Sequence, residues 1–240
     1  MIKTIILSLL ILHATLSANE IFGIIKKITG IVESGDKLLI IKDKVYIGNI
    51  ITTKQNSKVM IYQSNGNVIT MGQNSKLELL KEKEVATKIG SVYFDIARKI
   101  SKDLTKFKFK IKLKSASIGI RGTNFIITAK DNDENVMLRK GNLNILANKG
   151  DFSLYETKEK DEFNAYKAEF DKYSNDFNAE FNKYKEEDKY KFNGFLKEFN
   201  LEENTMLTFS KDNKVYKNKL TKKAIKNKFD SFDDFSYSTN

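Results

Sequence analysis

Residues 21–150 are a succession of short apolar, β-branched runs separated by turns of Gly, Asn, Asp and Ser. Each run has the length of a strand. Two pairs of runs flank Ser64–Asn67 and Asp131–Asn135, a pattern typical of hairpins. The segments between runs are too short for crossover helices, which disfavours a parallel α/β fold. The sequence therefore predicts a mainly β fold, with an antiparallel, solenoid-like or sandwich-like domain over residues 19–156.

The run from Phe107 to Leu113 alternates strictly between apolar and lysine side chains. A period of two predicts a half-buried strand whose apolar face packs in the core. The lysine face is a candidate site for an anionic polymer of the cell envelope. Alternatively, the lysines keep the strand soluble and discourage edge pairing. This candidate polyanion face consists of Lys106, Lys108, Lys110, Lys112 and Lys114.

Aromatic residues dominate residues 157–200, where they recur at steps of three and four. A mean step near 3.6 matches a straight α-helix better than a supercoil. We therefore expect one long amphipathic helix whose apolar face needs a partner surface. That surface is the β domain, a second copy of the chain, or a membrane interface. The expected packing stripe contains Phe163, Tyr166, Phe170, Tyr173, Phe177, Phe181 and Tyr184.

The remaining residues, 201–240, form a small C-terminal region. Residues 205–216 have the pattern of a short hairpin. Residues 219–229 are rich in lysine and predict a basic helix. Residues 230–240 are acidic and predict a disordered tail.

Residues 1–18 have the anatomy of a secretory signal peptide: Lys3 precedes an apolar segment that ends in small residues at Ala18. We expect cleavage after Ala18 or one residue earlier, and a location in the periplasm or outside the cell. A position peripheral to the outer membrane is a variant of this expectation. An uncleaved anchor is disfavoured because a membrane helix needs about 20 apolar residues.

Cysteine, proline and tryptophan are absent, and the single histidine, His13, lies inside the expected signal. A mature chain of this kind lacks the side chains of Ser-His-Asp catalysis and His-ligated metals. It also lacks disulfides. The acidic run Asp131–Asn135 lacks the Gly and Glu that a calcium loop needs. We therefore expect no enzymatic activity, no metal and no cofactor.

The formal net charge of the chain is +11. Basic proteins often bind nucleic acid, but an exported chain rarely meets any, so we expect no nucleic-acid partner. Anionic envelope polymers and acidic protein faces fit the expected compartment better. A solvated lysine-rich surface is the simplest interpretation of this charge.

Three blocks between residues 28 and 147 carry a recognisable pattern: Ile47–Thr53, Ile118–Phe125, which contains Arg121-Gly122-Thr123, and Leu138–Ile145. Their order resembles that of the periplasmic FecR domain family. The most specific block is Ile118–Phe125, which resembles that family's pattern V-R-G-T-x-F. The resemblance implies an all-β domain that senses or relays through protein contacts, without catalysis. Its motif marks a candidate structural or partner-contacting turn at Gly119, Arg121, Gly122, Thr123 and Phe125.

Each residue of this turn also has a purely structural interpretation. The glycines provide positive φ or allow a close approach of strands. Arg121 bonds loop carbonyls within the turn, or pins an acidic partner. Thr123 bonds the turn backbone.

The sequence thus favours an exported, non-enzymatic binding, scaffold or sensing module for an envelope protein whose identity it does not give. The alternative is an outer-membrane-associated structural or oligomeric protein that uses the aromatic helix. FecR regulators of the iron-dicitrate type carry a cytoplasmic segment and a membrane helix before this domain. Here only 18 residues precede the expected mature start, so we expect no direct sigma-factor control.

Overall fold

A computed structural model describes residues 20–97, 109–120, 122–130, 133–157 and 189–237. The described part of the chain is mainly β, as the sequence predicts. It consists of nineteen strands, a short 3₁₀ turn, η1 (Lys211–Asn213), and one C-terminal helix, α3 (Lys222–Tyr237). The expected signal peptide and the aromatic stripe from Phe163 to Tyr184 lie outside the described residues.

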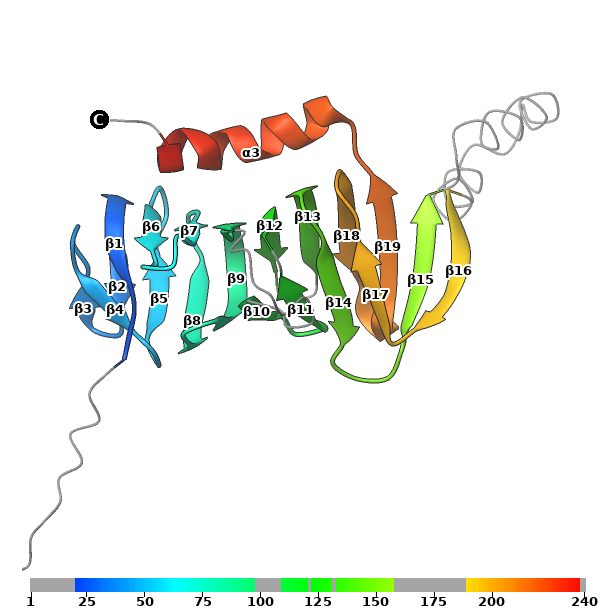
Figure 1. Cartoon of the computed structure of the whole chain (residues 1–240), viewed down its shortest axis with the longest axis horizontal. Coiled ribbons are helices and arrows are strands. Elements are labelled where there is room, and N and C mark those ends of the chain that lie inside the picture. Colours follow the sequence, from blue (N-terminus) through cyan, green and yellow to red (C-terminus); the bar gives the residue numbers. More distant parts are fainter. Residues whose placement is uncertain (1–19, 98–108, 121, 131–132, 158–188, 238–240) are drawn as a thin grey trace, which may run out of the picture.

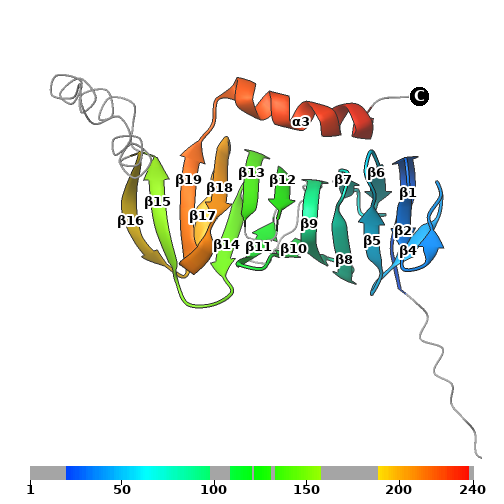
Figure 2. The same ribbon diagram turned by 180° about the vertical axis from the view of Figure 1, so that it is seen from behind.

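The strands form two hydrogen-bonded sheets that share one strand, and Figures 1 and 2 show these sheets as two layers. Sheet A contains, in spatial order, β4 (Lys44–Tyr46), β1 (Ile21–Thr29), β6 (Lys58–Tyr62), β7 (Val68–Met71), β9 (Glu84–Asp95), β12 (Asn124–Ala129), β13 (Glu134–Lys140), β18 (Thr205–Phe209), β19 (Lys214–Lys219), β15 (Phe152–Thr157) and β16 (Tyr190–Leu196).

Sheet B lies across the core from sheet A. It contains, in spatial order, β3 (Lys37–Leu38), β2 (Val32–Ser34), β5 (Ile50–Thr53), β8 (Lys76–Lys81), β9, β10 (Phe109–Lys112), β11 (Ala116–Ile120), β14 (Leu143–Ala147) and β17 (Glu198–Leu201).

Strand β9 joins the two sheets. Its first half pairs with β8 and β10 in sheet B, and its second half pairs with β7 and β12 in sheet A. Gly90 lies at the change of sheet with φ +88°. A Cβ on Gly90 would overlap Ser75, so the corner needs glycine both for its dihedral angle and for space.

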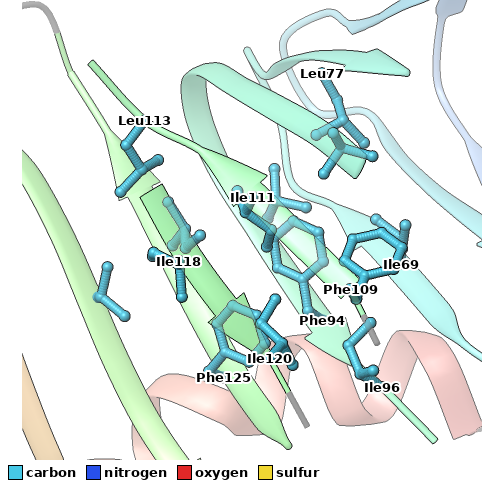
Figure 3. Close-up of a cluster of buried hydrophobic side chains, with 14 of the residues drawn as sticks. Ile69, Leu77, Phe94, Ile96, Phe109, Ile111, Leu113, Ile118, Ile120 and Phe125 are labelled. Carbon is cyan, nitrogen blue, oxygen red and sulfur yellow. The ribbon is translucent and has the colours of Figure 1, made fainter. Parts of the chain in front are cut away.

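Apolar side chains from both sheets meet in one continuous core. Figure 3 shows its centre, where the Phe94 ring stacks on Phe125 with 5.0 Å between centroids. The lysine-rich strand contributes as its alternation predicts, with Phe109 and Ile111 buried. Burying one such side chain is worth about 1.5–3 kcal/mol. The alternating runs of the sequence thus supply the main free energy that holds the two layers together.

Two strand pairs, β9 with β10 and β15 with β19, are parallel, which the antiparallel expectation did not include. Between β15 and β19, the described residues form β16 and β18 in sheet A and β17 in sheet B.

The expected helix over residues 157–200 is wrong at its C-terminal end, where Tyr190–Leu196 and Glu198–Leu201 are strands. Gly194 has φ +138° and would weaken a helix interior by about 1 kcal/mol relative to alanine. Phe199 instead packs its ring against Phe152 at 6.0 Å. The aromatic residues Phe192, Phe195 and Phe199 are spaced three and four positions apart, as in a helix, but here they lie on two short strands joined by a bend.

The C-terminal region also differs from its sequence-based description. Over the predicted hairpin, β18 and β19 pair antiparallel. The predicted disordered tail is wrong over residues 230–237, because α3 continues through them. Phe232 is buried in this stretch and anchors it to the β layers. Figures 1 and 2 show α3 running along the sheet A side, from the end of β19 back toward β1.

Candidate interaction surface beneath the C-terminal helix

One side of α3 is buried against the outer face of sheet A. Its buried residues are Ile225, Phe229 and Phe232, spaced four and three apart, as one face of a helix requires. They form a second apolar cluster with Tyr93 and Ile126, and the half-buried Met137 packs against it. We call the sheet A face that α3 covers the helix groove; Tyr93, Ile126, Met137 and Arg139 line it.

Aromatic and cationic groups bring the two surfaces together. The Tyr93 ring meets Phe229 edge to face at 5.8 Å and Phe232 at 5.9 Å. The Arg139 guanidinium lies 4.4 Å from the centre of the Phe229 ring. Each contact of this kind contributes about 0.5–1.5 kcal/mol beyond simple burial.

A charged pair lies at the rim of this apolar contact. Arg139 donates to both carboxylate oxygens of Asp233, at 2.5 and 3.2 Å, and to the Tyr93 hydroxyl at 2.9 Å. Burial alone would lower the pKa of Arg139, but its hydrogen bonds to Asp233 raise it. The arginine therefore stays cationic, and its guanidinium binds the planar carboxylate of Asp233 through two parallel hydrogen bonds.

The last residue of α3 contacts a second polar group. The Tyr237 hydroxyl donates to Asp95 Oδ2 and lies 3.4 Å from the Tyr93 hydroxyl. Asp95 Oδ1 accepts a 2.5 Å bond from the side-chain amide of Asn124. Burial raises the pKa of both Tyr93 and Tyr237, so both phenols are neutral at physiological pH.

Two further bonds fix the helix along its length. The Lys58 ammonium donates to the Ser231 carbonyl at 2.9 Å, and the Thr70 and Ser236 hydroxyls are 2.7 Å apart. Lys58 also lies 5.8 Å from the centre of the Phe235 ring. The helix is thus held by a small apolar contact surrounded by polar groups from several strands of sheet A.

The predicted turn lies at the edge of this surface. Gly122 has φ +63°, and Phe125 is fully buried, whereas Gly119 lies inside β11 rather than at a turn. Arg121 lies outside the described residues. Thr123 exchanges backbone bonds with Ile96, and within the described chain its hydroxyl has no hydrogen-bond partner, contrary to the expected bond to the turn backbone.

The turn is one of several similar corners. Asn56 and Asn74 have positive φ like Gly122, and each is followed by a buried serine, Ser57 or Ser75. Each serine hydroxyl accepts an amide bond across the corner, from Ile31 at 2.8 Å and from Ser91 at 3.0 Å. The third corner has Thr123 in the serine position, packed against Gly141. The turn therefore has a structural role that recurs along the domain.

Residues 49–144 match the family model described as FecR protein. The chain carries a FecR domain. The matched residues run from the loop before β5 into β14, so the FecR domain supplies all four residues of the helix groove, Tyr93, Ile126, Met137 and Arg139. Helix α3 lies outside the matched residues.

Two solved structures are similar to the chain. They are crystal structures, at 1.65 and 2.50 Å resolution, of a candidate anti-sigma factor from Parabacteroides distasonis. Each is 11% identical to this chain over 73% of its length, with TM-scores of 0.45 and 0.44. The chain spans 62% of the length of those solved chains. A comparison with curated proteins found no match.

The lysine face of the FecR domain is partly described. Lys110 and Lys112 are exposed on the outer face of sheet B, and Lys114 follows them, also exposed. Lys112 forms a 2.7 Å ion pair with Glu84, which holds the pKa of that carboxyl below its usual value. One lysine of the face is therefore neutralised locally. Lys106 and Lys108 lie outside the described residues, so the extent of the face stays a prediction.

Among the described residues, no group of three or more His, Cys, Asp or Glu side chains is arranged to hold a metal ion. None of the described helices has the length and hydropathy needed to cross a bilayer.

Sequence reasoning missed the helix groove. The spacing of Ile225, Phe229 and Phe232 predicts an amphipathic helix through residue 232, but the acidic composition of residues 230–240 obscured it. Nothing local to Arg139 shows that it meets Asp233, which lies 94 positions later in the sequence.

Proposed function

We propose that this chain is an exported regulatory module that senses or relays a signal through its FecR domain by contacting another envelope protein, without catalysis. The observation that carries the proposal is the FecR match over residues 49–144. The two sheets support it, because a continuous core gives a rigid platform that presents loops and one helix-covered face to a partner.

The test is photo-crosslinking in the native cell envelope from single exposed positions. Suitable positions are Lys110 on sheet B and Lys226 on α3, both exposed. We expect one of them to capture a defined protein, while an exposed control position at Asp36 captures none. Capture of glycan or lipid alone from either position would contradict a protein relay, and equal nonspecific products from all three positions would contradict it too.

An oligomeric or membrane-associated structural role is the second candidate, and one surface favours it. Phe192 and Phe195 on β16 are 46% and 70% exposed, with their rings 5.1 Å apart. The row of rings continues through Tyr155 and Tyr216 to Tyr190. In this alternative, light scattering shows an oligomer, or the chain floats with lipid vesicles, and Phe195→Ser abolishes that behaviour.

A further inference from the structure

The charged residues at the two ends of helix α3 interact unfavourably with the helix dipole. Its first turn carries Lys222 and Lys223, and no acidic residue. Its last two turns carry Asp230, Asp233 and Asp234, and its last turn has no basic residue. The helix dipole favours the opposite arrangement, by about 0.3–1 kcal/mol for each charge near an end. A helix of this length is marginal in water, so α3 depends on its contacts with sheet A.

The anchors of α3 form a compact recognition pattern. Two aromatic residues three positions apart, Phe229 and Phe232, enter the helix groove, and an acid follows at Asp233. An apolar residue one turn earlier, Ile225, completes the buried side. Amphipathic helices that bind grooves in other proteins use this i, i+4, i+7 spacing of anchors.

The groove is complementary to an acidic helix. The floor is apolar, and Tyr93 and Ile126 are buried in one cluster with Ile225, Phe229 and Phe232 of α3. Two cations of sheet A contact α3, Arg139 through Asp233 and Lys58 through the Ser231 carbonyl, while one carboxylate, Asp95, accepts a bond from Tyr237 at the last residue of the helix. A helix with an acidic side therefore gains both burial and a paired charge, whereas a basic helix would place its cations beside the half-buried Arg139.

We propose that the outer face of sheet A beneath α3 is a binding groove for an acidic amphipathic helix of a partner protein, and that α3 occupies it in cis until the partner helix displaces it. This goes beyond the proposed relay role, because it names the contact surface and the chemistry of the partner. Release of α3 uncovers Tyr93, Ile126 and Arg139 together.

A peptide probe tests the groove directly. The probe is a fluorescein-labelled synthetic peptide of residues 221–237, titrated with the full chain by fluorescence anisotropy. The release variant combines Phe229→Ala with Asp233→Lys, which removes one anchor and the Arg139 partner from α3. Asp234→Lys is the matched control, because it makes the same charge change at an exposed neighbour. We expect the release variant to bind the peptide at least about tenfold more tightly than the wild type or the control.

A charge swap shows where the peptide binds. In the release variant, Arg139→Glu should weaken the probe about tenfold or more. A peptide carrying Asp233→Lys should bind the Arg139→Glu release variant better than it binds the release variant alone. Arg139 changes that leave the affinity untouched would overturn the proposal, since the probe would then bind elsewhere.

A crosslink tests the groove without weakening the fold. The chain has no cysteine, so Thr70→Cys with Ser236→Cys introduces the only two thiols, at side chains whose oxygens are 2.7 Å apart. The oxidised protein should bind no probe, and reduction should restore binding. Equal binding before and after reduction would overturn the proposal.

Two results with the release variant would also overturn it. In one, the release variant is folded but binds no probe; in the other, light scattering shows that it only associates with itself. Crosslinking of an envelope protein from Lys110 tests the relay role separately.

Discussion

Single residues at the corners decide whether the two sheets can meet. Gly90 and Gly35 both have positive φ, but they differ in their surroundings. A Cβ on Gly90 would overlap Ser75, whereas a Cβ on Gly35 would meet no atom within 4 Å. Alanine at Gly35 therefore measures the free-energy cost of the positive φ alone, whereas alanine at Gly90 adds the cost of overlap with Ser75.

We expect Gly35→Ala to lower the free energy of unfolding by about 1–2 kcal/mol, the cost of a left-handed alanine. Gly90→Ala should cost distinctly more, about 3 kcal/mol or above, because Ser75 must move as well. Gly122→Val, at φ +63°, should cost about 1–3 kcal/mol. Denaturant unfolding measures all three. Equal losses at Gly35 and Gly90 would show that overlap with Ser75 is unimportant.

Also at the scale of single residues, the ion pair between Glu84 and Lys112 makes the free energy of unfolding depend on pH. Lys112 lowers the pKa of Glu84 below its ordinary value of 4.5. A carboxyl whose folded pKa is lowered stabilises the fold above its unfolded pKa, and it loses that contribution as pH falls through the folded pKa. The stability difference between wild type and Glu84→Gln should therefore be constant above pH 4.5 and shrink below it.

At the scale of the element, α3 is held by groups that titrate at high pH. Burial raises the pKa of Tyr93 and Tyr237 above the ordinary value of 10.0. A group with a raised folded pKa contributes fully below its unfolded pKa, and it loses that contribution as pH rises through the folded value. We expect α3 to dock at full strength below pH 10 and to release above it.

Near-ultraviolet circular dichroism and phenolate absorbance follow this release together. Tyr237→Phe removes the hydroxyl that bonds Asp95 and should flatten the alkaline transition. An alkaline transition of equal size in the variant would assign the pH dependence to another tyrosine.

The predictability of each element follows from where its stabilising contacts lie. The strand of Phe109 and Ile111 was predictable because alternation is a local signal. β16 was not, because Gly194 and its pairing with β15 outweigh an aromatic spacing that fits a helix. α3 was half predictable: its apolar spacing is a local signal, but the contact of its Asp233 with Arg139 is not. The repeated letters Gln-Asn-Ser-Lys at residues 55–58 and 73–76 were a usable signal for the corners.

At the scale of the whole molecule, β9 makes the two sheets one cooperative unit. Its halves belong to different sheets, and the apolar core is continuous across them. We expect the β layers to unfold in a single transition, and α3 to open at a lower free energy because of its unfavourable charges. Native-state hydrogen exchange should show α3 amides exchanging first and the β9 amides last. Two separate melting steps for β1–β8 and β11–β19 would contradict this.

Export is the second prediction at this scale. N-terminal sequencing of the native protein should find Asn19 or Ala18 as the first residue. A native protein that begins with Met1 would contradict the signal peptide.

The recurring corner has a consequence for how chains of this kind change length. Each corner is closed by a left-handed residue, a hydroxyl side chain and one nearby glycine, so its geometry is set almost entirely by neighbouring residues. Duplication of one such unit would add strands to both layers while leaving the other corners intact, as in proteins built from stacked repeats. The length of the two sheets along their row of strands can then change in evolution. Unequal recombination within the gene can add such a unit to the two sheets, provided that α3 becomes longer or contacts different strands of sheet A.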